Sequence, residues 1–105
     1  MADARAYHVY VIELDREACE QHQCPARNGS APVYVGQSAV SPKTRFAQHK
    51  DGYKSSRVVH KFGKKLSPGL SDGYGPYGTR EEALRAEATL AETLKRQGFC
   101  VFGGH

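Results

Sequence analysis

An acidic residue lies on the apolar face of the longest helical pattern in the sequence. In residues 79–98, stepping about 100° per residue collects apolar side chains on one face, and these are Ala83, Ala86, Leu90, Ala91 and Leu94. Glu87 falls near the centre of this face. A buried carboxylate is costly unless a positive group lies beside it. We therefore expect Glu87 to face a cation, either a metal ion or an arginine.

Two tyrosines, an arginine and a histidine are the other residues whose types could act chemically together with that carboxylate. Tyr10 and Tyr34 lie in stretches typical of strands, HVYVI and VYVG. Arg45 and His49 lie four residues apart in a helical pattern and therefore point the same way. Arginine grips two phosphate oxygens at once, and histidine titrates near neutrality. Each also has a plainer explanation, because tyrosines often pack in sheets and helix arginines and histidines are often only exposed.

The sequence predicts a hairpin followed by helices. Residues 7–14 and 32–36 predict two strands that pair antiparallel, with Gly36 ending the second. Residues 15–31 are polar and form an enlarged loop between them. Residues 64–70 hold a third short strand, and FCVF near the end of the chain is an edge strand or a tail packed on the sheet.

Three helical patterns follow the hairpin, over residues 42–50, 55–62 and 79–98. Ser41 and Pro42 suit the N-cap and first position of the first helix. Ser55 or Ser56 caps the second helix, and a glycine, residue 63, closes it. Thr79 and Glu82 form a capping box for the third helix. The 105 residues suit one domain over residues 1–105, with an α+β fold in which helices flank a small antiparallel or mixed sheet of about three strands.

The order and spacing of these residues resemble those of the GIY-YIG nuclease family. His8-Val9-Tyr10 takes the place of the first motif, and Tyr34-Val35-Gly36 takes the place of the second. Arg45 and His49 follow on a helix, and Glu87 lies in the last long helix. The resemblance covers most of the chain. It implies a GIY-YIG-like fold and a metal-dependent endonuclease that hydrolyses phosphodiester bonds.

The resemblance also implies a role for each residue. Glu87 would hold one divalent cation, Mg²⁺ or Mn²⁺, which binds oxygen and keeps most of its waters. Arg45 would hold the scissile phosphate. Tyr34 would activate or orient the attacking water, with Tyr10 in support, although a phenol of pKa about 10 needs a nearby cation to ionise. His49 would lie near the phosphate and is the alternative base.

The chain departs from the family pattern at several positions. His8 stands in place of the glycine of the first motif, and the lysine that some branches carry after the second motif is Gln37 here. The late asparagine of many members is absent, since Asn28 lies in the hairpin loop. The alternative is therefore a catalytically weak or inactive nucleic-acid-binding module on the same fold.

The charge distribution favours a nucleic acid partner, and we expect DNA. The net charge is +4, and the stretch from Lys43 to Lys65 carries eight basic residues against one acid, Asp51. Such residues contact backbone phosphates, which position a protein without specifying sequence. The plainer reading is a solvated helical face. The residues expected to contact nucleic acid are Gln37, Lys43, Lys50, Lys54, Arg57, Lys61 and Lys64.

Cysteine and histidine cluster in the hairpin loop. Cys19, His22 and Cys24 would supply three zinc ligands if a fourth, such as Cys100, came close. Their spacing is not that of a familiar zinc knuckle. We therefore expect Mg²⁺ or Mn²⁺ and not zinc, and the other reading of this loop is a segment with free thiols.

The sequence also predicts a cytoplasmic protein. No stretch approaches the roughly 20 apolar residues of a membrane span, and residues 1–7 lack an apolar signal region. We expect reduced cysteines, no membrane partner and no small-molecule cofactor. The sequence does not specify an oligomeric state.

Overall fold

The computed structural model describes residues 6–21, 26, 29–52 and 56–103. Within these residues, four strands form one mixed sheet in the order β3-β1-β2-β4. The strands are β1 (His8–Leu14), β2 (Val33–Ser38), β3 (Gly63–Leu66) and β4 (Val101–Gly103). β1 is antiparallel to β2 and β3, and β4 runs parallel to β2. The predicted α+β class and the hairpin are confirmed. The sheet has four strands where about three were predicted, and the edge-strand reading of FCVF is confirmed, because Val101 and Phe102 lie in β4.

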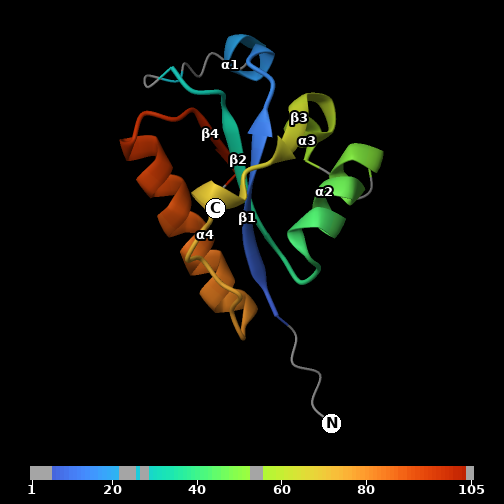
Figure 1. Ribbon diagram of the computed structural model, residues 1–105, viewed down its shortest axis with the longest axis vertical. Coiled ribbons are helices and arrows are strands. Elements are labelled where there is room, and N and C mark those ends of the chain that lie inside the picture. The colour runs from blue at the N-terminus through green and yellow to red at the C-terminus, as the bar shows by residue number, and fades with distance from the viewer. Residues whose placement is uncertain (1–5, 22–25, 27–28, 53–55, 104–105) are drawn as a thin grey trace.

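Helices cover both faces of the sheet. They are α1 (Glu17–Gln21), α2 (Pro42–Asp51), α3 (Arg57–Phe62), a 3-10 turn η1 (Pro68–Leu70) and α4 (Arg80–Arg96). Figure 1 shows α4 on one side of the sheet and α2 and α3 on the other. In the described part of the chain, no helix is long and apolar enough to cross a membrane.

Alternation along β1 divides the core into two clusters. Val9 and Val11 point to α4 and pack with Leu90 and other apolar residues of that helix. Tyr10 and Ile12 point to the opposite face and pack with α3. Because the side-chain period of a strand is two, a shift of register by one residue would exchange these faces.

The predicted helix starts are observed. Ser41 caps α2, with its hydroxyl accepting from the Thr44 N–H at 3.2 Å. Thr79 caps α4, with its hydroxyl accepting from the Glu82 N–H at 3.2 Å. The Glu82 carboxylate accepts from the Thr79 hydroxyl at 3.1 Å. These bonds fix where α2 and α4 begin, and so which of their residues face the sheet.

Two local predictions were wrong. The loop over residues 15–31 contains the short helix α1. β2 does not end at Gly36, which pairs with Tyr10 inside the strand. The predicted ends of α3 are observed, with Ser56 as the N-cap and Gly63 as the C-cap. Gly63 has an extended backbone, with φ of −62°, because it also starts β3.

Candidate active site

Three aromatic rings from three elements meet on the face that α2 and α3 cover. The ring centroids of Tyr10 and Tyr34 are 6.4 Å apart, and that of His49 lies 6.2 Å from Tyr10 and 5.6 Å from Tyr34. Gly36 makes room for them. A Cβ at this position would lie 2.6 Å from Cζ and the hydroxyl oxygen of Tyr10. The glycine of the second motif is therefore required for packing the site, and not for ending the strand.

The hydrogen bonds of His49 determine its tautomer. Its Nδ1 accepts from the backbone N–H of Ser56 at 3.1 Å, and its Nε2 lies 3.0 Å from the Tyr10 hydroxyl oxygen. A backbone N–H can only donate, so Nδ1 carries the lone pair and Nε2 carries the proton of the neutral ring. His49 thus donates to Tyr10, which leaves the hydroxyl proton of Tyr10 for another acceptor.

His49 is neutral near pH 7. Burial, followed by the charge of Arg45, lowers the pKa of His49 from 6.5 to about 4. The single lone pair of the neutral ring is occupied by the Ser56 N–H. The alternative in which His49 is the general base is therefore disfavoured, and the geometry gives it the role of orienting Tyr10.

Arg45 lies one turn before His49 on α2 and is half-buried. Its guanidinium donates to the Gln48 side-chain carbonyl at 3.1 Å. Its charge opposes the rise that burial causes in the pKa of Tyr10 and Tyr34. Arg45 and His49 therefore act on the same rings, as their spacing predicted.

Glu87 is buried on α4, with 6% of its surface exposed, as the helical pattern predicted. Tyr10 and Tyr34 belong to the cluster on the face that α2 and α3 cover, whereas α4 packs on the opposite face.

The charge of Glu87 nevertheless acts on both phenols, because it raises the pKa of each. β4 pairs with Val33, Tyr34 and Val35, so in the described chain no strand flanks the outer edge of β2 beyond this point. Gly36 follows and adds no side chain.

The site is electrically polarised. Burial is the largest cause of the raised pKa of each phenol. At Tyr34 the charge of Glu87 is the second cause and exceeds the opposing effect of Arg45. At Tyr10 the second cause is Tyr34, and Arg45 acts more strongly than Glu87. The charge of Glu87 therefore outweighs that of Arg45 at Tyr34, and the charge of Arg45 outweighs that of Glu87 at Tyr10.

A cation bound at this site would need oxygen ligands. Among the described residues, no group of three or more His, Cys, Asp or Glu side chains could hold a metal ion, and the predicted zinc ligands His22 and Cys24 lie outside those residues. Both ring nitrogens of His49 are already engaged. Mg²⁺ is held by one or two carboxylates and keeps several waters, and the carboxylate of Glu87 fits this pattern.

The basic residues predicted to contact nucleic acid differ in their surroundings. Lys43 and Arg57 are exposed on α2 and α3. Lys50 donates to the carbonyls of Gly63 at 2.9 Å and His60 at 3.4 Å. Lys50 therefore connects α2 to the end of α3, and has a structural role that the sequence did not predict.

The other basic residues of this set have partners or lie elsewhere. Lys61 donates to the Gln21 side chain at 3.1 Å. Lys64 lies 4.0 Å from the Glu13 carboxylate. Lys54 lies outside the described residues. The predicted basic residues therefore do not all face solvent freely, because some of them contact other residues of the protein.

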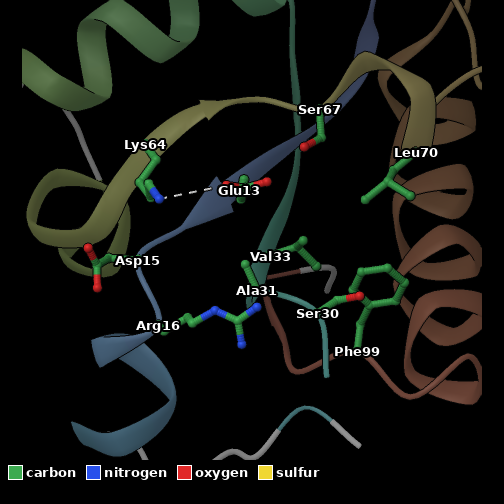
Figure 2. A pocket seen from close by; sticks show the side chains of 10 residues that line it. All are labelled: Glu13, Asp15, Arg16, Ser30, Ala31, Val33, Lys64, Ser67, Leu70 and Phe99. Atoms are coloured by element: carbon green, nitrogen blue, oxygen red, sulfur yellow. Dashed lines mark ion pairs between the residues drawn. The ribbon is translucent and has the colours of Figure 1, made fainter. Parts of the chain in front are cut away.

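A polar pocket of about 500 Å³ lies apart from the ring cluster. Figure 2 shows Arg16 and Lys64 extending into it, with Leu70 and Phe99 on the far side. It contains none of the predicted catalytic residues. This pocket could not be predicted from the sequence, because its walls come from segments far apart in the chain.

Two residues have surroundings that the sequence did not predict. The backbone of Ser56, predicted only as a helix cap, holds His49. Gln37, predicted to contact nucleic acid, is half-buried in β2, and its side-chain oxygen is buried. Neither the hydrogen bond of Ser56 nor the burial of the Gln37 oxygen follows from residue type, because both depend on residues that come close only in the folded chain.

The cysteines differ from the prediction. Cys19 is free, but Cys100 is buried and disulfide-bonded. His22 and Cys24 of the predicted zinc set lie outside the described residues. Disulfides persist mainly in oxidising environments, so the bond at Cys100 disagrees with the predicted reduced state.

Comparisons with protein-family models, with curated proteins and with solved structures found no match to this chain. The resemblance to the GIY-YIG nucleases therefore depends on the residues described above and on their arrangement in an α+β fold.

Proposed function

We propose that this protein is a metal-dependent endonuclease of the GIY-YIG type that hydrolyses phosphodiester bonds in DNA. The observation that carries the proposal is that a buried carboxylate, Glu87, and a half-buried guanidinium, Arg45, act with opposite charge on the same phenol, Tyr34. Glu87 raises the pKa of Tyr34 and Arg45 opposes that rise. Hydrolysis of a phosphodiester uses such a pair, with a carboxylate to recruit a cation and a guanidinium to bind the phosphate.

Each residue has a role that its surroundings support. Arg45 holds the scissile phosphate, because its planar guanidinium matches two phosphate oxygens. Glu87 holds Mg²⁺ or Mn²⁺, which when bound neutralises charge that develops on the phosphate. Tyr34 orients the attacking water. Tyr10 accepts a hydrogen bond from His49 and presents its own proton to the phosphate.

Proton removal from the water is the most demanding part of this function. Both phenols have a raised pKa, with burial as the main cause, so both are protonated near neutral pH. Tyr34 can act as a base only when positive charge lowers its pKa. Arg45 is the residue of this chain that already acts in that direction.

The test is cleavage of plasmid and branched DNA in the presence of Mn²⁺. Glu87→Ala should abolish cleavage, and Arg45→Lys should lower its rate at least about 100-fold, as for the loss of a donor to a developing anion. Glu92→Gln is the matched control, because Glu92 is exposed on the same helix. Equal inactivity of the wild type and Glu87→Ala at high protein concentration would exclude catalysis.

A second function is an inactive nucleic-acid-binding module on the same fold. The raised pKa of both phenols favours it, because neither is a ready base at neutral pH. This function predicts DNA binding that weakens with salt and does not respond to a chelator or to Glu87→Gln. Cleavage that needs a divalent cation would exclude it.

A further inference from the structure

A buried amide oxygen next to the second motif has no hydrogen-bond donor. Gln37 Oε1 is buried and unpaired among the described residues. Buried polar atoms are nearly always paired, so an exception in a native fold calls for a physical explanation. An unpaired carbonyl oxygen is also a good ligand for a hard cation.

The alternation of β2 turns Gln37 towards α4. Val33 and Val35 belong to the cluster that packs on this helix, whereas Tyr34 belongs to the opposite cluster. Side chains at every second position share a face, so Gln37 continues the row of Val33 and Val35. Glu87 faces the sheet from α4 on this same side.

Helix α4 and strand β2 run in opposite directions. The helix follows Tyr77, which bridges to Tyr7 just before the start of β1, where β1 pairs with the end of β2. At its other end the chain reaches Cys100, whose carbonyl accepts from the N–H of Val33 at 3.0 Å. The start of α4 thus lies beside the end of β2.

The distances along α4 and β2 place Gln37 and Glu87 at about the same height along the sheet. Leu94, near the end of α4, and Val33, at the start of β2, belong to the same apolar cluster. Glu87 lies about 10 Å back along the helix from Leu94, at about 1.5 Å per residue. Gly36 and Gln37 lie about 10 and 13 Å along the strand from Val33, at about 3.3 Å per residue.

We propose that the side-chain oxygen of Gln37 is a second ligand for the cation held by Glu87. This inference rests on the proposed function, because it requires that cation. A neutral amide oxygen adds a ligand without adding charge, which leaves the positive charge of the ion available to the phosphate. It also explains why this oxygen is buried without a donor.

The test is a measurement of the Kd for Mn²⁺ on the full chain without nucleic acid. The electron paramagnetic resonance signal of free Mn²⁺ reports how much of the ion is not bound. Gln37→Leu should raise the Kd about tenfold, as for loss of an oriented partner of a metal site. Gln37→Glu should lower the Kd. Gln21→Leu is the control, because Gln21 is exposed on α1, and should leave the Kd unchanged.

The outcomes separate the two proposals. If Glu87→Gln abolishes Mn²⁺ binding but Gln37→Leu does not change it, the role of Gln37 is excluded and the endonuclease proposal stands. If Glu87→Gln has no effect on Mn²⁺ binding, the proposed metal site is excluded.

Thermal melting in a chelator completes the test. Gln37→Leu should melt at or above the wild-type temperature, and a clear fall would mean that the amide is bonded within the protein and would overturn the inference.

Discussion

The Nε2 nitrogen of His49 lies 3.0 Å from the hydroxyl oxygen of Tyr10, while its Nδ1 accepts from the backbone of Ser56. Ser56 precedes α3, His49 lies in α2 and Tyr10 lies in β1, so the two hydrogen bonds connect these three elements. They keep the imidazole neutral and determine which way the Tyr10 hydroxyl proton points. His49 is therefore a positioning residue, and a change in its charge should affect the whole arrangement.

The first prediction concerns stability and pH. The pKa of His49 is lowered from 6.5 in the unfolded chain to about 4 in the folded protein. Between these values the unfolded chain binds a proton that the folded protein does not, so the stabilising effect of the neutral ring is complete above pH 6.5 and lost as the pH falls to 4. We expect the free energy of unfolding to fall by about 3 kcal/mol from this group.

Urea unfolding across this pH range measures the effect. Carboxylates also titrate there, so the quantity to compare is the difference between the wild type and His49→Gln. The difference should shrink towards pH 4. A wild-type curve parallel to that of His49→Gln would contradict the prediction.

The second prediction concerns Gly36. An alanine Cβ there would lie 2.6 Å from the ring of Tyr10 and 3.0 Å from that of Tyr34, so the rings must move. We expect Gly36→Ala to cost about 1–3 kcal/mol of stability and to abolish cleavage. Gly69→Ala is the control, because no atom lies within 4 Å of its added Cβ. Melting temperatures and cleavage rates measured on both variants test this, and an active, stable Gly36→Ala protein would show that the ring cluster is not needed.

The third prediction concerns the ionisation of Tyr34. After burial, the charge of Glu87 is the largest cause of its raised pKa. Glu87→Gln should therefore lower the pKa of Tyr34, and saturating Mg²⁺ should lower it in the wild type by cancelling the same charge. The measurement is a tyrosinate absorbance titration of each protein minus that of its Tyr34→Phe variant. No change in either case would mean that Glu87 is not part of the site.

The fourth prediction divides the basic residues by their contacts. Lys43→Ala and Arg57→Ala should weaken DNA binding and each reduce the slope of log K against log salt by about 1, because both are exposed. Lys50→Met should instead lower the melting temperature, because it loses the bonds to Gly63 and His60. Salt-dependent gel shifts with melting curves distinguish the two effects. A salt slope unchanged in both exposed variants would exclude this surface.

Local features could be predicted from the sequence. The N-caps at Ser41 and Thr79, the inward position of Glu87 and the β1–β2 hairpin depend on residues close together in the chain. A cap needs a side chain three residues from its donor, and a helical face needs only a regular period. The choice of residues for the site came from the resemblance to the GIY-YIG motifs, and it stays a prediction.

The tertiary structure alone decided how these residues act. β4 lies parallel to β2, α4 lies across the sheet from the phenols, and Ser56 fixes the tautomer of His49. Each of these depends on backbone groups or charges that come from distant parts of the chain. A sequence determines which side chains are present and which face of an element they share. Burial, hydrogen-bond partners and electrostatic neighbours are set only when the elements pack, because these quantities depend on distance in space.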